Sequence, residues 1–239
     1  FPKLMAIAAL IFSRYSSQRL PGKALMDIYG RCLLGRVIDR TKLIKGIDKI
    51  IVATSSDESD DPIIRFLERE DVYIHRGSLD NVFSRALETC EAFNLKKFAR
   101  ICGDRPFFQP DIVSEFIKIH KAEDLDVVTN TFPRACPPGL SAEVISAVSL
   151  RSIAKHINKP HYKEHLTSYF YCHSHRFAIK NIPFRGNKDF QGINLCVDNQ
   201  IDLDRARWIA KEMASRSLAY DNIREIISLA REWKKIESQ

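Results

Sequence analysis

The sequence is short of the features that mark membrane proteins, zinc-binding domains and disulfide-rich domains. No apolar run approaches the roughly 20 residues needed to cross a bilayer, so we expect a soluble protein without membrane insertion. The six cysteines form no CxxC pair and follow no regular spacing, which argues against a zinc site or a disulfide framework. We therefore expect a cytoplasmic protein whose thiols, at positions 32, 90, 102, 136, 172 and 196, are reduced.

Several motifs of well-known sites are missing as well. The sequence contains neither the GxxxxGK[ST] loop nor GxGxxG, and neither HExxH nor GxSxG, so four common kinds of ligand or catalytic site lack their signatures. The formal net charge of +7 is compatible with nucleic acid, an acidic membrane surface or small polyanionic substrates. Aromatic and basic residues do not alternate as they do on nucleic-acid-binding sheets, so we expect no nucleic-acid partner.

The chain does have a regular alternation of strand-like and helix-like segments over its 239 residues. This pattern predicts a single α/β domain with a mostly parallel sheet flanked by helices. After residue 132 a Pro/Gly-rich loop leads into an extended segment, and we expect a smaller second-half lobe over about 133–192, followed by a closing strand and helices over about 193–239. We expect strands at 5–12, 49–56, 72–77, 97–103, 126–131, 178–183 and 193–198, and helices at 33–44, 61–70, 79–93, 110–120, 149–173, 200–214 and 221–235.

The stretch RYSSQRLPGK, residues 14–23, follows the first expected strand directly. A loop that leaves the carboxyl end of the first strand of an open parallel sheet lies at the edge where such folds bind ligands. One alternative is an exposed basic loop without a ligand. The concentration of cations and hydroxyls favours a triphosphate site, with candidate residues Arg14, Ser16, Ser17, Arg19, Gly22 and Lys23.

Two aspartates follow apolar runs that resemble buried strands. Asp104 lies in CGDRP, and Asp198 lies in LCVD. An aspartate at a strand end is also common in turns, and Asp198 could equally be the N-cap of the helix that follows. Mg²⁺ is usually held by one or two carboxylates together with substrate phosphates, so beside a phosphate-binding loop both aspartates become candidate metal ligands.

Two further segments carry less specific signals. Arg76 ends the third expected strand at the same sheet edge, and Ser78 is a plausible N-cap for the helix after it. The segment 161–171 places Lys163 and His165 on an expected helix with an apolar face. A histidine in such a helix is more often a packed or solvated group than a ligand contact.

Taken in order, these motifs resemble those of the cytidylyltransferase family of spore-coat polysaccharide biosynthesis. This family is related to the 3-deoxy-manno-octulosonate and acylneuraminate cytidylyltransferases. The N-terminal signature is matched by RYSSQRLPGKALMDIYGRCLL, and the resemblance covers essentially the whole chain. The later family motifs correspond here to RGSLDNVFSR, CGDRP, TNT, PPGLSAEV, KEHLT and VDNQIDL.

The resemblance implies a Rossmann-like fold of the nucleotide-diphospho-sugar transferase type. It also implies a Mg²⁺-dependent reaction in which CTP and a sugar give a CMP-sugar and pyrophosphate, for surface polysaccharide biosynthesis. On this basis the nucleotide-binding part is about 1–132, and the lobe at about 133–192 serves the acceptor and dimerisation. Related enzymes are commonly dimers through this lobe, so a homodimer is expected.

The resemblance also implies a role for each candidate residue. Arg14 and Lys23 would hold the β- and γ-phosphates and, with Asp104, form the catalytic set. Asp104 and Asp198 would hold Mg²⁺, and Arg76 is the candidate for base recognition. The acceptor sugar would face Glu143, Lys163 and His165, with Lys163 suited to the carboxylate of an acid sugar. The nucleotide-binding set is then Arg14, Ser16, Ser17, Arg19, Lys23 and Arg76.

The sequence departs from the family pattern at several positions. FSR stands at the entry to the loop where QAR or PAR is usual, Gln18 replaces Ser or Thr, Lys163 replaces Arg, and VDNQIDL lacks the TPED tetrad. A sugar-1-phosphate nucleotidyltransferase that uses another nucleotide is an alternative, but its Gly-rich GxGTRLxPxTxxxPK loop is missing. A non-catalytic nucleotide-binding partner is a second alternative, and the altered VDNQIDL segment keeps it open.

Overall fold

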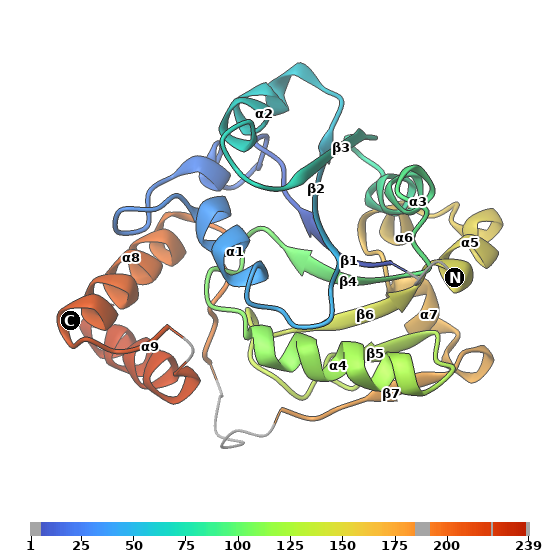
Figure 1. The fold of residues 1–239 in the computed structure, drawn as a ribbon. Helices are drawn as coiled ribbons and strands as arrows, with labels where there is room; N and C mark the ends of the chain where they lie inside the picture. The colour runs from blue at the N-terminus through green and yellow to red at the C-terminus, as the bar shows by residue number, and fades with distance from the viewer. Residues whose placement is uncertain (1–5, 185–191, 221, 238–239) are drawn as a thin grey trace.

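The computed structural model describes residues 6–184, 192–220 and 222–237, and within them a sheet of seven strands forms the centre of the fold (Figure 1). The order of the strands across the sheet is β3-β2-β1-β4-β6-β5-β7. β6 is antiparallel to both of its neighbours, and the other pairs are parallel, which confirms the predicted α/β class. The strands are β1 (Ile7–Phe12), β2 (Lys49–Ser55), β3 (Tyr73–Gly77), β4 (Lys97–Cys102), β5 (Val127–Thr129), β6 (Glu143–Ser146) and β7 (Ile179–Asn181).

The topology reverses between β1 and β4. From β1 the chain adds β2 and β3 on one side of the sheet and then returns to add β4 on the other side of β1. Phe12 at the end of β1 lies opposite Cys102 at the end of β4. In open α/β sheets, ligands bind outside the carboxyl ends of the strands at such a reversal. The loop after Phe12 and the CGDRP segment therefore leave adjacent strands at the predicted edge.

Helices cover both faces of the sheet. One face carries α1 (Leu33–Thr41), α2 (Asp61–Leu67) and α4 (Pro110–Ala122). The other face carries α3 (Val82–Ala92), α5 (Ala147–Ser152), α6 (Pro160–Glu164) and α7 (Ser168–Cys172). Two longer helices, α8 (Gln200–Ser215) and α9 (Ile223–Glu237), pack on each other beyond the carboxyl ends of the central strands (Figure 1).

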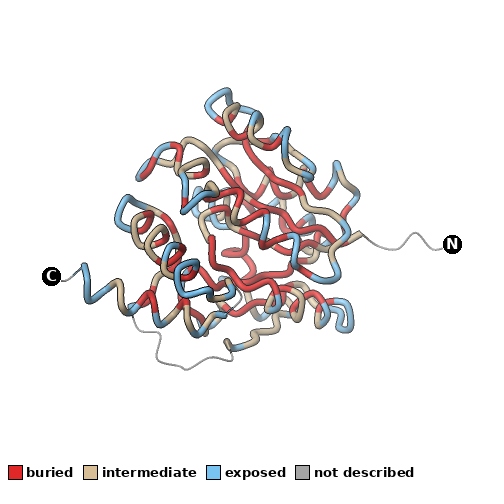
Figure 2. The backbone as a smooth tube through the Cα atoms, turned by 60° about the vertical axis from the view of Figure 1, so that its left-hand side comes forward, coloured by how far each residue is buried: buried red, intermediate tan, exposed pale blue. Residues whose placement is uncertain are grey.

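Strand β1 is buried on both sides, as a central parallel strand requires. Ala9 and Ile11 pack with α1, α2 and α4, whereas Ala8 and Leu10 pack with α3, α5 and α7. Successive side chains of a strand point to opposite faces, so the unbroken apolar run IAALI supplies both cores. Figure 2 shows the buried residues gathered in the centre of the molecule and the exposed ones on the outer turns of helices and loops.

The strand predicted at 193–198 is wrong. The segment is extended but joins no sheet, and its backbone makes single hydrogen bonds, from Leu195 N to Pro138 O and from Val197 N to Asp104 O, both 2.9 Å long. The alternating apolar residues Ile193, Leu195 and Val197 are buried against α8 and α9. The alternation therefore reflects burial of one side of an extended segment, not pairing with a strand.

Two smaller expectations are also wrong. The helix predicted over 149–173 is divided into α5, α6 and α7 with a 3₁₀ turn at Ala154–His156, and Pro160 starts α6 because it suits a first helical turn. Asn81, not Ser78, is the N-cap of α3, since its side chain accepts a hydrogen bond from Ser84 N. Across the described ranges, no helix is both long enough and apolar enough to cross a membrane.

Candidate active site at the carboxyl ends of β1 and β4

A buried aspartate fixes the start of the loop that follows β1. Asp60 Oδ1 accepts a hydrogen bond of 2.6 Å from Tyr15 N, and its Oδ2 accepts from Thr54 and Ser55. Burial alone would raise the pKa of Asp60, but the hydrogen bonds from Ser55, Tyr15 and Thr54 outweigh it and hold the pKa below its usual value. The charged carboxylate thus ties the loop to the end of β2.

Gly22 lets the loop fold back on itself. Its φ is 75°, a conformation that L side chains rarely adopt, and its N–H donates to Tyr15 O at 2.8 Å. A Cβ at this position would lie 3.1 Å from the Tyr15 ring, so a side chain would also crowd the turn. Ser16 and Ser17 are half-buried, and within the described parts of the chain neither hydroxyl makes a hydrogen bond, which leaves both available to a ligand.

The end of the loop contacts the segment before α8. Lys23 Nζ donates to Val197 O at 2.7 Å and to Asp198 Oδ1 at 3.0 Å, and Arg19 Nη2 lies 2.9 Å from the same Asp198 oxygen. The Lys23 side chain is only 15% exposed, whereas that of Arg19 is 68% exposed. Two cations of the loop thus share one carboxylate that comes from 175 residues further along the chain.

Asp104 lies beside this group. Its carbonyl accepts the 2.9 Å hydrogen bond from Val197 N, which joins the CGDRP turn to the residue before Asp198. Within the described residues, Asp104 Oδ1 is buried and has no hydrogen-bond partner. No cluster of three or more His, Cys, Asp or Glu suited to a metal is found in the described ranges. A buried carboxylate oxygen without a hydrogen-bond donor, on a turn bonded to the residue before Asp198, nevertheless fits an ion that takes its remaining ligands from phosphates.

The N-cap interpretation of Asp198 is wrong. Asn199 is the N-cap of α8, and its side chain accepts from Asp202 N. Asp202 in turn accepts from Asn199 N, which completes a reciprocal capping box. The Asp198 carboxylate is therefore not needed by the helix and is directed to Lys23 and Arg19.

Arg14 contacts different parts of the fold from those that Lys23 and Arg19 contact. Its Nη1 donates to Leu79 O at 2.9 Å and its Nη2 to Glu164 Oε1 at 3.3 Å, so it joins the loop to the turn before α3 and to α6. The contacts of Arg76 are local, because Nε donates to Ser55 O and Nη2 donates to Asp57 O, each at 2.8 Å. These bonds hold the ends of β2 and β3 together, and base recognition by Arg76 stays a prediction.

Glu143 is the centre of a buried polar cluster. Its Oε2 accepts a 2.7 Å hydrogen bond from Arg100 Nη1, and its Oε1 accepts from Thr167 Oγ1 at 2.8 Å and Tyr171 OH at 2.5 Å. Burial would raise the pKa of Glu143, but Arg100 and the two hydroxyls hold it below its usual value. The carboxylate is thus charged and fully engaged, at the start of β6 next to the end of β4.

The other two predicted acceptor residues lie in α6 and at its end. Lys163 is half-buried in the last turn of α6, and His165 is the C-cap residue of that helix. Partial burial of the ring, the neighbouring His161 and the guanidinium of Arg100 lower the pKa of His165, against the opposing effect of Glu164. The His165 ring is therefore near Arg100, and α6 borders both Arg14 and the Glu143 cluster.

Sequence reasoning missed three residues of this region. Asp60 lies in the acidic run DESD after β2, which gives no sign that one of its carboxylates is buried. Arg100 interrupts the apolar run of β4, and Arg105 occupies the variable place in CGDRP. Only Arg100 gave a signal in the sequence. A cation within an apolar strand requires a partner of opposite charge, which predicts a buried ion pair.

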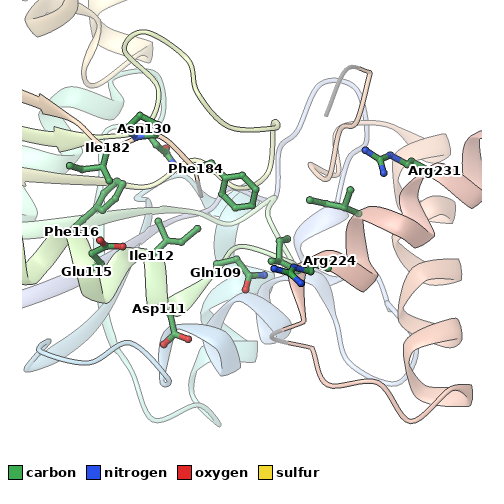
Figure 3. Close-up of a pocket in the computed structure, with 13 residues that line it drawn as sticks. Gln109, Asp111, Ile112, Glu115, Phe116, Asn130, Ile182, Phe184, Arg224 and Arg231 are labelled. Atoms are coloured by element: carbon green, nitrogen blue, oxygen red, sulfur yellow. The ribbon is translucent and has the colours of Figure 1, made fainter. Parts of the chain in front are cut away.

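A cavity of about 640 Å³ lies elsewhere, on the face of the sheet that carries α4 (Figure 3). Figure 3 shows it between α4, the ends of β5 and β7, and α9. None of the predicted site residues lines it. Its lining residues are Gln109, Asp111, Ile112, Glu115, Phe116, Asn130, Ile182, Pro183, Phe184, Ile223, Arg224, Ile227 and Arg231.

Comparison with known proteins agrees with this geometry. The sequence profile of the family described as Cytidylyltransferase matches residues 8–227, almost the whole chain. The chain belongs to the cytidylyltransferase family. The match spans β1 and its loop, β4 with Asp104, and the segment that carries Asp198.

Curated relatives match between 54% and 88% of this chain. It is 27% identical to the uncharacterized protein MJ1063 of Methanocaldococcus jannaschii over 81% of this chain and 79% of that one. It is 26% identical to the spore coat polysaccharide biosynthesis protein SpsF of Bacillus subtilis over 88% of each chain. A 3-deoxy-manno-octulosonate cytidylyltransferase of Aeromonas salmonicida is 28% identical over 54% of this chain and 51% of its own.

Solved structures share the fold of this chain. A cytidylyltransferase from Leptospira borgpetersenii superposes with a TM-score of 0.84 at 23% identity, over 98% of this chain and 96% of that one. A CMP:2-keto-3-deoxy-manno-octonic acid synthetase complexed with CTP has a TM-score of 0.64 at 17% identity, over 88% and 99%. A Mycobacterium tuberculosis protein in complex with manganese has a TM-score of 0.59 at 16% identity, over 84% and 98%.

Proposed function

We propose that this cytidylyltransferase transfers CMP from CTP to an acid sugar and releases pyrophosphate, for surface polysaccharide biosynthesis. The observation that carries the proposal is the contact of the cationic loop with the segment that joins the two candidate metal ligands: Lys23 is bonded to Val197 O and Asp198, and Val197 N is bonded to the backbone carbonyl of Asp104. The relatives SpsF, a spore coat polysaccharide biosynthesis protein, and the 3-deoxy-manno-octulosonate cytidylyltransferases support the pathway and the kind of acceptor. The CTP-bound neighbour supports the choice of nucleotide.

The chemistry requires mainly positioning and charge neutralisation. A sugar hydroxyl attacks the α-phosphorus in line while pyrophosphate leaves, so the protein must hold both groups and stabilise the departing charge. Lys23 and Arg14 would bind the β- and γ-phosphates, with hydrogen bonds from the hydroxyls of Ser16 and Ser17. Arg19, which is largely exposed, would reach the triphosphate from the solvent side.

Asp104 and Asp198 would hold a divalent cation, which we propose to be Mg²⁺. Bound there, the ion would neutralise charge on the α-phosphate and lower the pKa of the attacking hydroxyl. Oδ1 of Asp104 accepts no hydrogen bond among the described residues and has the Arg105 guanidinium only at 3.8 Å, which supports this assignment, since a buried carboxylate oxygen needs a close donor or cation. Asp198 would exchange part of its contact with Lys23 for the ion, which frees the ammonium group for phosphate.

The acceptor would lie over β6, α6 and α7. Both oxygens of Glu143 already accept hydrogen bonds, which favours a positioning role for it: the carboxylate fixes Arg100, Thr167 and Tyr171. Lys163 and His165 remain the candidates from α6 for direct contact with the sugar. A homodimer formed through the second-half lobe and a cytoplasmic location belong to the same proposal.

Nucleotide binding tests the proposal first. Isothermal titration calorimetry with CTP, UTP, GTP and ATP, each with Mg²⁺, should show preference for CTP and loss of tight binding when EDTA is added. Equal affinity for the four nucleotides, or CTP binding that EDTA leaves unchanged, would contradict a metal-dependent cytidylyltransferase. The Lys180→Ala variant is a matched control, because Lys180 pairs with Glu123 on the surface, away from the loop.

A further inference from the structure

Arg105 is a half-buried cation with few hydrogen-bond partners. It follows Asp104 directly, and its side chain is 18% exposed. Its Nη1 donates to Ser141 O at 3.2 Å. Its Nε is buried without a hydrogen-bond partner among the described residues, and it lies 3.8 Å from Asp104 Oδ1, beyond hydrogen-bond distance. Among the described residues, this guanidinium with five donors thus has one hydrogen bond to a backbone carbonyl and one long ion pair with Asp104.

The carboxylates near Arg105, those of Asp104 and Glu143, are shared with other groups. Glu143 accepts three hydrogen bonds from Arg100, Thr167 and Tyr171, so its oxygens are engaged. Asp104 is the proposed metal ligand, and a cation bound there would take that charge as well. Arginine does not lose its proton in proteins, so a metal that drew on the Asp104 charge would leave the unbonded Nε–H of Arg105 available to an anion in the loaded site.

The position of Arg105 decides which substrate supplies this anion. β4 lies between β1 and β6 in the sheet, and the triphosphate loop leaves β1. Arg105 is held by Ser141, two residues before β6, which is the side of β4 away from that loop. The same side carries the Glu143 cluster that borders the acceptor.

We propose that Arg105 binds the carboxylate of the acceptor sugar and so selects an acid sugar over a neutral one. This inference rests on the proposed function and assigns the selection to Arg105, a residue of the metal-binding turn, in addition to Lys163. The planar guanidinium can donate two parallel hydrogen bonds to a carboxylate, which an ammonium group cannot. One turn would then hold both the metal ligand and the acceptor's charge, and would bring the sugar to the α-phosphate.

Calorimetry with an acid sugar and its neutral analogue tests the inference. The protein is saturated with a non-hydrolysable CTP analogue and Mg²⁺ and titrated with 3-deoxy-manno-octulosonate or with the same sugar reduced to the alcohol at C1. The wild type should prefer the acid. Arg105→Gln should weaken binding of the acid by about 10- to 150-fold, the range for a hydrogen bond to a charged group, and leave the alcohol and the CTP analogue unaffected.

Arg134→Gln is the matched control, because Arg134 also donates to Ser141, at Oγ, but is exposed. It should change the affinity for the acid by no more than about twofold. If Arg105→Gln does not fold, Arg105→Lys replaces it. The lysine variant should lose part of the affinity for the acid, because lysine keeps the positive charge but cannot donate two parallel hydrogen bonds to a carboxylate.

The outcomes separate this inference from the function on which it rests. A wild type that does not bind the CTP analogue overturns both. A wild type that binds the analogue but shows no preference for the acid overturns the role of Arg105 and the choice of an acid sugar, and leaves the CTP-binding part of the proposed function standing. Equal losses for the acid and the alcohol in the Arg105 variants, or a loss of affinity for the CTP analogue instead, would also overturn it.

Discussion

Replacing Lys23 with alanine removes a contact that the structure shows and a contact that the proposed function requires. In the structure, Lys23 Nζ supplies the hydrogen bond to Val197 O and the ion pair with Asp198, and its side chain is 15% exposed. A partly buried carbonyl without its donor costs about 1–3 kcal/mol, and an ion pair of this exposure adds up to about 1 kcal/mol. We therefore expect the free energy of unfolding to fall by about 2 kcal/mol.

For a chain of this size that loss lowers the melting temperature by about 4–8 °C. The affinity for CTP should fall more steeply, by about 10- to 150-fold, because the variant loses a hydrogen bond to a charged phosphate. Chemical denaturation measures the first quantity and titration calorimetry the second, with Lys180→Ala as control for both. Wild-type affinity for CTP in Lys23→Ala would refute the triphosphate site. An unchanged free energy of unfolding would refute the contact of Lys23 with Val197 and Asp198.

Three further changes test neighbouring groups. Glu143→Gln should cost about 3–5 kcal/mol at pH 7, because it leaves Arg100 buried without its counter-charge. Since the folded state lowers the pKa of Glu143 below its ordinary 4.5, its contribution is present above that pH and is lost as the pH falls further; the variant's stability should therefore fall less steeply with acid than the wild type's. Asp198→Asn should melt close to the wild type but release pyrophosphate at least about 100-fold more slowly, and a near-wild-type rate would remove Asp198 from the metal site. Asn199→Ala should show the reverse: about 1 kcal/mol less stability in denaturation, with turnover retained, and an intact stability would mean that α8 does not depend on this cap.

The parts of the site that could be predicted from the sequence are those with a local signal. The cationic loop and Asp104 each follow an apolar run directly, and the period of two that marks a strand also locates its end. Parallel neighbours end at one edge, so the loop and Asp104 were expected together, and the sheet order places them on adjacent strands.

The parts that could not be predicted depend on contacts between distant segments. Arg14 pairs with Glu164 across 150 residues, and Arg100 pairs with Glu143 across 43. No periodicity reports such pairs, because a charged side chain in sequence looks the same whether it is solvated or paired. The strand predicted at 193–198 is wrong for a related reason. Alternating apolar residues show that one side of a segment is buried, but they do not show which element covers that side.

The most direct test of the central claim is pyrophosphate release by the purified wild type with CTP, Mg²⁺ and a panel of sugar acids that includes 3-deoxy-manno-octulosonate. We predict release that requires CTP, the metal and an acid sugar together, and that falls to background in Asp104→Asn. Release that is equally fast with UTP, GTP or ATP, or that persists in Asp104→Asn, would contradict the account, as would the absence of release with every sugar acid in the panel.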